Sequence, residues 1–335
     1  MQVLLRNYWY PACASSRLDS NPKAVRLLAQ DLGLLRDSER RAHALRDRCC
    51  HRGAKLSVGQ VNQGRIACRY HGWEYDGAGR CVHIPSLVAS GRIPDSFMVP
   101  TFPCFERDSY VWLWMGDGPP HPREPPAIPE CADFEWLQGS TPFNCAALRM
   151  IANNMDWCHP GFTHENTHPM WFMNKAQGFQ EVVYELRLTE NGCQIIFPPT
   201  QNAEDPVPEE GFTDRFELPC AVFLRTQFPR MSYRVIMFHV PTGPDTFRLE
   251  WMHTRQPGSG VTWMGDENEI FKQDRSVVET TEPAYRGDGG GAFECSVEAD
   301  ASTLLVRRIV KLAAAGEWER KRVVLMQRRL VRVRS

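Results

Sequence analysis

Two short stretches each place a cysteine beside a histidine: Cys49 with His51, and Cys68 with His71. Two thiolates and two imidazoles fit a tetrahedral zinc ion. They also fit a [2Fe–2S] cluster in which one iron takes both cysteines and the other takes both histidines. A spacing of two or three residues within each pair suits a loop that supplies two different metal ions, and glycines follow both pairs. The spacing therefore favours the cluster, with zinc as the alternative.

A second candidate site lies at His159 and His164, which are five residues apart. Non-haem Fe(II) that activates dioxygen is held by two histidines and one carboxylate. In a regular α-helix five residues turn the side chains about 140° apart, so the two imidazoles would not share a face. A helix break is required, and Pro160-Gly161 makes one plausible.

Composition bounds the function. The 335 residues carry 39 Lys+Arg against 40 Asp+Glu, which argues against a general nucleic-acid-binding protein. No apolar run reaches the roughly 20 residues of a membrane helix, and no signal peptide is visible, so no membrane attachment and a cytoplasmic location are expected. In that compartment the twelve cysteines are expected to be thiols rather than a disulfide framework.

The elements that must position these residues differ along the chain. Roughly the first hundred residues contain short apolar runs separated by glycine-rich turns, typical of β-structure, and Arg107–Met115 is expected to close this region as a strand. Six prolines in Gly116–Pro129 mark a linker. The rest predicts strands followed by helices, an α+β sheet domain. The expected strands are Glu181–Leu188, Cys193–Phe197, Ala221–Phe228, Met231–Val240 and Thr246–His253, and the expected helices are Ala146–His159, Asp266–Glu282 and Ser302–Leu312.

Taken together, Cys49-x-His51-Arg52-Gly53 and Cys68-x-x-His71-Gly72-Trp73 resemble the signature of Rieske non-haem iron oxygenases. The resemblance extends from about Trp9 to Trp318 and is strongest to the vanillate and dicamba demethylase group. It implies an all-β Rieske domain (1–116) and a helix-grip catalytic domain with an antiparallel sheet (130–318), on either side of the proline-rich linker (117–129). The basic tail (319–335) lies beyond the resemblance. The tail is expected to be a solvated end. Cys50 and Arg69 occupy positions that are commonly proline in the family.

The resemblance also assigns roles. Cys49, His51, Cys68 and His71 would hold the [2Fe–2S] cluster. His159, His164 and Asp274 would hold the mononuclear iron, with Asn153 nearby. Asp156 would hydrogen-bond both His159 and the Rieske ligand His71 of a neighbouring subunit. The rival ligands are His168, Asp266, Glu267, Glu269 and Glu279.

The activity implied is a monooxygenase that hydroxylates or demethylates a small molecule with O2. The chain has no GxGxxG nucleotide fingerprint, so electrons from NAD(P)H are expected to arrive through a separate reductase or ferredoxin. A homotrimer is expected. The alternative is a Rieske-type electron carrier or iron sensor, which would need only the first constellation.

The substrate is the least specified part. Apolar pockets with few polar anchors are typical for small molecules. The candidate lining residues are Phe172, Phe223, Met237, His239, Trp251 and His253, although each is more often a core residue. Two substrate classes remain open: methoxy- or methyl-bearing aromatic acids, and natural-product scaffolds such as the alkaloids of saxitoxin-type oxygenases.

Overall fold

The structure is a computed structural model. It describes residues 4–128, 134–164, 181–197, 212–228, 231–255, 257–258, 269–287, 294–325 and 328–334. The chain forms two compact units, residues 6–128 and residues 129–335 with the first five residues. Each unit is described by itself. In the part of the chain described, every helix is too short or too polar to cross a membrane.

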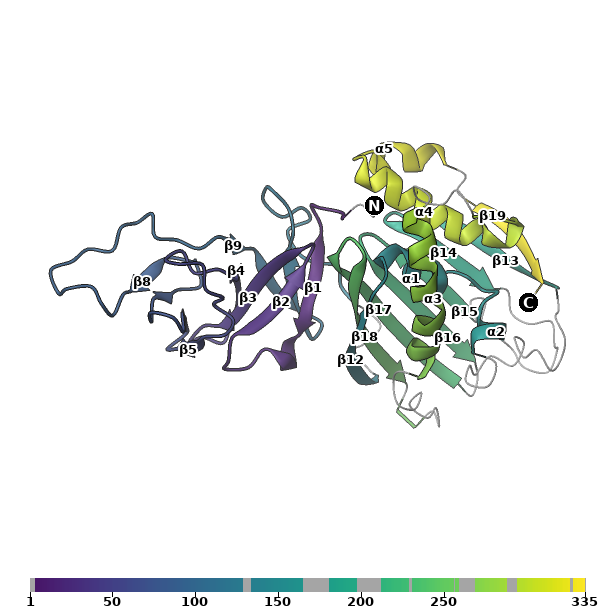
Figure 1. Cartoon of the computed structure of the whole chain (residues 1–335). Coiled ribbons are helices and arrows are strands. Elements are labelled where there is room, and N and C mark those ends of the chain that lie inside the picture. Colours follow the sequence, from purple (N-terminus) through teal and green to yellow (C-terminus); the bar gives the residue numbers. More distant parts are fainter. Residues whose placement is uncertain are drawn as a thin grey trace. The chain divides into compact units, whose positions relative to one another are not determined.

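The N-terminal unit consists of three small antiparallel sheets, drawn from purple to blue in Figure 1. Their orders are β1-β11-β10, β2-β3-β4-β9 and β5-β6-β7-β8. The strands are β1 (Trp9–Ala14), β2 (Lys23–Leu27), β3 (Gln30–Arg36), β4 (Ala42–Arg46), β5 (Gln60–Asn62), β6 (Arg65–Ala67), β7 (Glu74–Tyr75), β8 (Cys81–His83), β9 (Thr101–Phe102), β10 (Cys104–Arg107) and β11 (Tyr110–Trp114).

One expected strand of this unit is divided in the structure. The run Arg107–Met115 is broken by a tight turn at Asp108 and Ser109, whose φ angles are 50° and 64°. The turn separates β10 from β11 and lets them pair as a hairpin, with Arg107 opposite Tyr110. The sequence does not mark this turn, because neither residue is a glycine, the residue type that usually adopts positive φ.

The C-terminal unit is built on an eight-stranded antiparallel sheet of order β12-β18-β17-β16-β15-β14-β13-β19. Five strands were expected; the other three, β12, β15 and β19, were not. The bounds are β12 (Glu135–Phe143), β13 (Glu181–Leu188), β14 (Gly192–Phe197), β15 (Phe212–Glu217), β16 (Ala221–Phe228), β17 (Met231–Gly243), β18 (Thr246–Arg255) and β19 (Arg328–Arg334).

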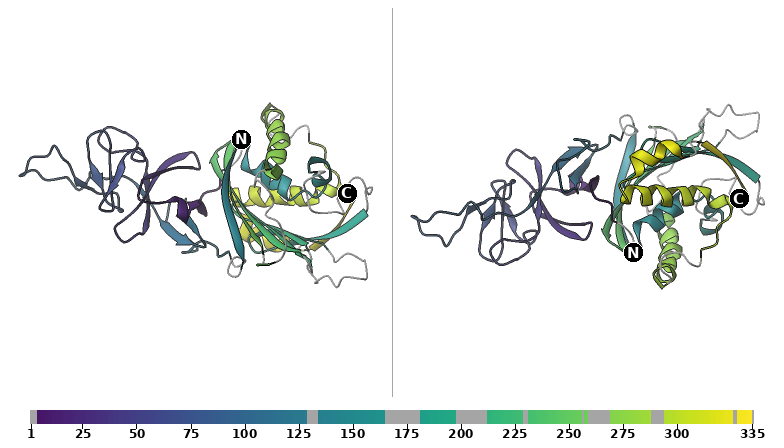
Figure 2. Two further views of the ribbon diagram at one scale, coloured as in Figure 1. Left: turned by 90° about the horizontal axis from the view of Figure 1, so that it is seen from below. Right: turned by 90° about the horizontal axis from the view of Figure 1, so that it is seen from above.

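Helices gather on one face of this curved sheet (Figures 1 and 2). They are α1 (Ala147–Asn154), α2 (Pro160–Thr163), α3 (Glu269–Gly287), α4 (Ala301–Ala314) and α5 (Trp318–Lys321). The amphipathic α4 buries Val306, Ile309 and Val310, while its Leu304 stays partly exposed. Apolar residues at this spacing lie on one side of a helix, which explains why α4 packs on the sheet.

The basic C-terminal segment is not a solvated end, and this part of the sequence analysis was wrong. β19 pairs with β13 along seven residues and buries Val331 and Val333. Two of its arginines form ion pairs: Arg328 lies 2.8 Å from Glu185, and Arg329 lies 3.3 Å from Glu298. The many arginines made the segment look like a solvated end, although burial of the alternating residues Val331 and Val333 stabilises it as a strand.

Candidate metal centres

The first candidate centre is formed by two loops of the N-terminal unit with the same hydrogen-bond pattern. Cys49 and His51 follow β4, and Cys68 and His71 follow β6. In the first loop the Gly53 N–H donates to the Cys49 carbonyl, and in the second the Gly72 N–H donates to the Cys68 carbonyl, both at 2.9 Å. Both glycines have positive φ, 74° and 70°.

The glycines that follow the two pairs in sequence close these loops. In the structure their N–H groups donate to the cysteine carbonyls. Positive φ favours glycine, so each loop can turn back sharply behind its cysteine. The two loops thus present matched Cys and His side chains.

The four side chains converge and fit an iron–sulfur cluster. Cys49 and Cys68 are 3% and 2% exposed, and the ring centroids of His51 and His71 are 4.7 Å apart. His51 stacks on Trp73 with ring centroids 4.4 Å apart. Its Nδ1 is buried and has no hydrogen-bond partner among the described residues. A buried ring nitrogen without a partner is suited to a metal ligand.

Tyr75 lies behind this centre, and its role was missed from sequence. Its buried hydroxyl is 3.0 Å from Sγ of Cys49 and 3.3 Å from Sγ of Cys50. Burial, and after it the two neighbouring thiols, raise the pKa of Tyr75, so the phenol stays protonated and can donate a hydrogen bond. Cys50, at a usual proline position, thus contacts a residue that also touches a candidate ligand.

The second candidate centre begins with the break between α1 and α2. α1 ends at Asn154 rather than at His159, and Pro160 starts α2. Within the connection Oδ1 of Asp156 accepts a hydrogen bond from the Cys158 N–H at 2.8 Å, which stabilises the turn. The break thus precedes His159 instead of following it. His159 and His164 lie at the two ends of α2, with a ring centroid distance of 5.4 Å.

Asp274 of α3 completes this group. Its Oδ1 is 3.5 Å from Nε2 of His159 and 3.1 Å from Nε2 of His164, and the three ligand atoms all lie within 4.8 Å of one another. Asp274 and His164 are 2% and 3% exposed. Burial alone would raise the pKa of Asp274, but the adjacent imidazoles of His159 and His164 outweigh it and lower the pKa. Two imidazoles and a carboxylate aimed at one point fit a non-haem iron ion.

The two rival ligands that the structure describes, Glu269 and Glu279, are not part of this group. Glu279 accepts a hydrogen bond from the Asn144 N–H, and Glu269 lies at the exposed start of α3 near Lys272. His168, Asp266 and Glu267 lie outside the described residues.

Asn153 and Asp156 both contact the group, but Asp156 does so differently from expectation. Asn153 Nδ2 donates to Oδ1 of Asp274 at 2.8 Å. Nδ1 of His159 donates to the backbone carbonyl of Asp156 at 2.8 Å, rather than to its carboxylate. Oδ1 of the carboxylate accepts the Cys158 N–H.

Two family models match the chain in the same order as these centres. Residues 8–103 match the Rieske [2Fe-2S] domain, and residues 143–316 match the vanillate O-demethylase oxygenase C-terminal domain. The chain belongs to the Rieske non-haem iron oxygenases. Membership confirms the predicted α+β fold with an all-β N-terminal part, and it implies a Rieske [2Fe–2S] cluster and a mononuclear iron as cofactors.

Relatives of this oxygenase include the dicamba O-demethylase oxygenase component of Stenotrophomonas maltophilia, 36% identical over 48% of this chain and 48% of that protein. TIC 55 of Arabidopsis thaliana is 31% identical over 66% of this chain and 40% of that protein. The matches thus span less than half of these relatives. Methylxanthine N1-demethylase NdmA of Pseudomonas putida is 27% identical over 91% and 88%.

Solved structures share the fold. An NdmA mutant with theobromine superposes with a TM-score of 0.79 at 23% identity, covering 97% of this chain and 96% of that one. Dicamba monooxygenase bound to dicamba gives 0.76 at 23% identity, covering 96% and 100%.

The predicted pocket residues of the oxygenase divide between the two faces of the sheet. Residues paired across antiparallel strands share a face, so Met237, Trp251, His239 and His253 lie on one side. This is the helix-covered face, because His239 contacts Asn154 of α1 at 2.8 Å and Trp251 packs on Phe271 of α3.

Phe223 pairs with Ile236 and lies on the opposite face of the sheet under the Arg215 guanidinium, apart from the other four predicted pocket residues. Phe172 lies outside the described residues. His239 also contacts the Cys220 carbonyl, and burial lowers its pKa to about 4, which indicates a neutral structural residue.

Proposed function

We propose that this chain is the oxygenase component of a monooxygenase system that hydroxylates or demethylates a small organic molecule. The observation that carries the proposal is the convergence of His159, His164 and Asp274 in the C-terminal unit. An electron carrier needs only the N-terminal centre, and a buried group of two imidazoles and a carboxylate would have no use in one. When bound, a non-haem iron supplies the chemistry that activates O2 for attack on substrate.

The side chains around this group have separable tasks in the proposal. Asp274 supplies negative charge inside a buried site, and Asn153 holds its Oδ1 with an N–H donor. The carbonyl of Asp156 fixes Nδ1 of His159 as the protonated nitrogen, which leaves Nε2 free as a ligand. Each of these hydrogen bonds fixes the orientation of one metal-ligating side chain, so the ligands are held in place before a metal ion binds.

The helix-covered face of the sheet is the proposed substrate side. Met237 and Trp251 supply apolar surface there, and buried His253, whose pKa desolvation lowers to about 4, supplies a neutral polar group. Asp214 shares this face through its pairing with Leu224 and was missed from sequence. Burial raises its pKa well above the usual value, although the Trp157 side chain opposes the shift.

Two substrate classes are candidates: methyl-bearing aromatic compounds and nitrogenous natural products. Removal of an O- or N-methyl group fits the names of the relatives, which include a dicamba O-demethylase and a methylxanthine N1-demethylase.

The remaining partners belong to the same proposal. Electrons come from NAD(P)H through a separate reductase or ferredoxin. The assembly is a homotrimer in which the Asp156 carboxylate meets His71 of a neighbouring copy. A closed ring of identical head-to-tail contacts is the symmetry that would repeat this pairing for every subunit.

Metal analysis and turnover together test the proposal. Purified protein should contain about three iron atoms per chain, two in the cluster and one more in the second site. A surrogate reductase, NADH and a panel of aromatic and alkaloid compounds should give a product heavier by one oxygen or lighter by one methylene. About two iron atoms and no product on any member of the panel would instead favour the electron carrier.

A further inference from the structure

The helix α3 contacts the second metal centre through two consecutive residues. Asp274 lies on its buried side with Phe271 and Val278, which are 9% and 6% exposed. These positions, three or four residues apart, form one face of the helix. Gln273 is turned about 100° from Asp274. That rotation places its side chain beside the buried face rather than away from it.

The imidazole of His164 is held at both ring nitrogens by this pair. Nε2 is 3.1 Å from Oδ1 of Asp274, and Nδ1 is 2.9 Å from Oε1 of Gln273. An amide oxygen only accepts hydrogen bonds, so Nδ1 of His164 must be the protonated nitrogen. The lone pair is then on Nε2, the nitrogen that faces Asp274.

We propose that Gln273 is a positioning residue that fixes the tautomer and ring orientation of His164 for iron binding. The inference rests on the proposed function of the His159, His164 and Asp274 group. Metal-bound histidines generally donate their second ring N–H to an acceptor, and loss of that acceptor typically weakens metal affinity 10–100-fold.

The two histidines differ in the source of this acceptor. Nδ1 of His159 donates to a backbone carbonyl three residues earlier in its own turn. Nδ1 of His164 depends on a side chain 109 positions away in sequence. A substitution can therefore remove the hydrogen-bond acceptor of His164 while leaving that of His159 intact. The helix α3 thus supplies one candidate ligand, Asp274, and orients another, His164, through Gln273.

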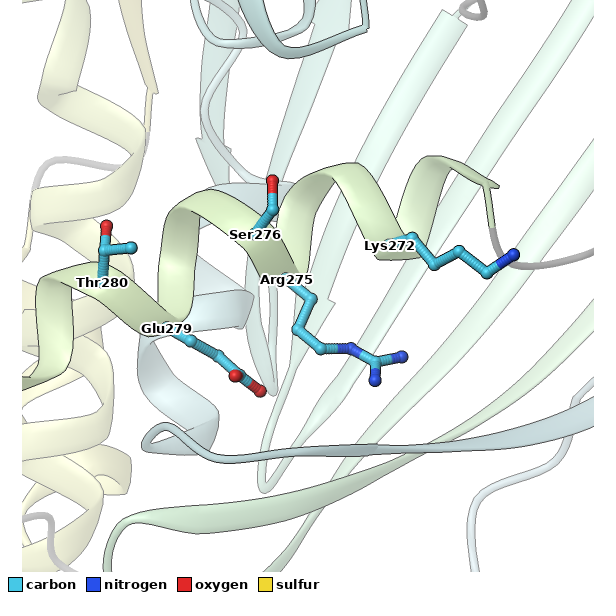
Figure 3. Close-up of a pocket in the computed structure, with 5 residues that line it drawn as sticks. All are labelled: Lys272, Arg275, Ser276, Glu279 and Thr280. Atoms are coloured by element: carbon cyan, nitrogen blue, oxygen red, sulfur yellow. The ribbon is translucent and has the colours of Figure 1, made fainter.

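Another side of α3 provides a matched control. Figure 3 shows Lys272, Arg275, Ser276, Glu279 and Thr280 along a pocket of ≈ 420 Å³, which neither Gln273 nor Asp274 lines. Lys272 precedes Gln273 directly, and its Nζ is 3.8 Å from a Glu269 carboxylate oxygen. Exposed pairs of this kind contribute little to stability. Lys272→Met thus removes a neighbouring polar group without touching His164.

The experiment uses the full chain with its Rieske cluster intact and the mononuclear iron removed. Fe²⁺ is titrated into wild type, Gln273→Leu, Gln273→Glu and Lys272→Met. The dissociation constant is measured, and the EPR spectrum of the Fe²⁺–nitric oxide adduct is recorded. Gln273→Leu should bind Fe²⁺ 10–100-fold more weakly and give an altered spectrum. Gln273→Glu keeps an acceptor and should restore most of the affinity, while Lys272→Met should match wild type.

Two results would overturn the role of Gln273. One is a Gln273→Leu protein with wild-type affinity and spectrum. The other is weakening that Gln273→Glu fails to rescue, with an equal loss of thermal stability in both variants, because this would indicate a packing role. Failure of the wild type itself to bind a third iron would instead remove the proposed function.

Discussion

The two metal centres of this protein are built on different principles. In the N-terminal unit, two loops with the same backbone hydrogen bonds each supply one cysteine and one histidine. In the C-terminal unit, a broken helical segment supplies two histidines and a distant helix supplies the carboxylate. The first centre thus depends mainly on local turn geometry, whereas the second depends on the packing of α3 against α1 and α2. Changes in α3 should therefore affect one centre only.

Asp274→Ala is expected to affect the second centre most strongly while leaving the first centre unchanged. The substitution removes the buried carboxylate between His159 and His164. The iron content should fall from about three to about two atoms per chain, while the visible absorption of the Rieske cluster persists. Turnover should fall on the order of 10³-fold or more, because several kcal/mol of metal-dependent stabilisation is lost. Simultaneous loss of the cluster would contradict the independence of the two units.

Asp156→Asn should impair electron transfer between the two centres without affecting metal binding. The side-chain oxygen can still accept the Cys158 N–H, and the backbone carbonyl still orients His159. Both metals should stay bound, yet turnover should fall roughly 100-fold because the proposed charged contact with His71 of a neighbouring copy is lost. Stopped-flow oxidation of the reduced cluster measures this step directly. Normal turnover in a fully metallated variant would remove Asp156 from the path.

The first centre, which depends on local turns, could be predicted from sequence more completely than the second, which depends on packing between distant elements. The Cys-x-His and Cys-x-x-His pairs are local. The five-residue spacing of the histidines predicted a break at Pro160-Gly161, but the chain breaks before His159, and Pro160 starts the short helix between the two histidines. Asp274 was found only through family resemblance, since no local pattern links it to His159. Gln273 was missed because its contact with His164 depends on the rotation of α3 in the packed unit.

The same reasoning applies to the fold. The strands of the sheet were predicted where apolar residues dominate them. β19 was missed because the arginines around Val331 and Val333 gave the segment a solvated composition, and its strand forms only through pairing with β13. The contact of Gln273 with His164 and the strand β19 were therefore missed for the same reason: each depends on a partner that is distant in sequence.

Tyr75→Phe should alter the first centre alone. It removes the hydroxyl that lies 3.0 Å from Sγ of Cys49. Hydrogen bonds to cluster sulfurs favour the reduced, more negative state, so the reduction potential should fall. Loss of about 1 kcal/mol corresponds to a decrease of about 40 mV for one electron. Redox titration of the cluster measures the shift, with Fe²⁺ affinity of the second site as the control. An unchanged potential would show that this hydroxyl does not interact with the ligand.

The smallest effect is expected from the Arg36–Glu106 pair, which connects β3 to β10 away from both centres. The two side chains are 2.6 Å apart, and Arg36 also donates to the Leu18 and Ser15 carbonyls. The hydrogen bond from Arg36 lowers the pKa of Glu106, although partial burial opposes the shift. A carboxyl with a lowered folded-state pKa stabilises the fold above its unfolded-state pKa of about 4.3, and this stabilisation is lost as the pH falls through the folded-state pKa.

Glu106→Gln should therefore destabilise the N-terminal unit at pH 7 by less than about 1 kcal/mol, since the pair is partly exposed. The difference from wild type should shrink as the pH falls below about 4.3, where the carboxyl is protonated first in the unfolded chain and, at lower pH, in the folded protein as well. Thermal unfolding followed through the cluster absorbance reports this unit specifically. A difference that stays constant with pH would assign the effect to the shape of the side chain rather than its charge. Because Glu106 contacts neither centre, the iron content should remain at about three atoms per chain in both proteins.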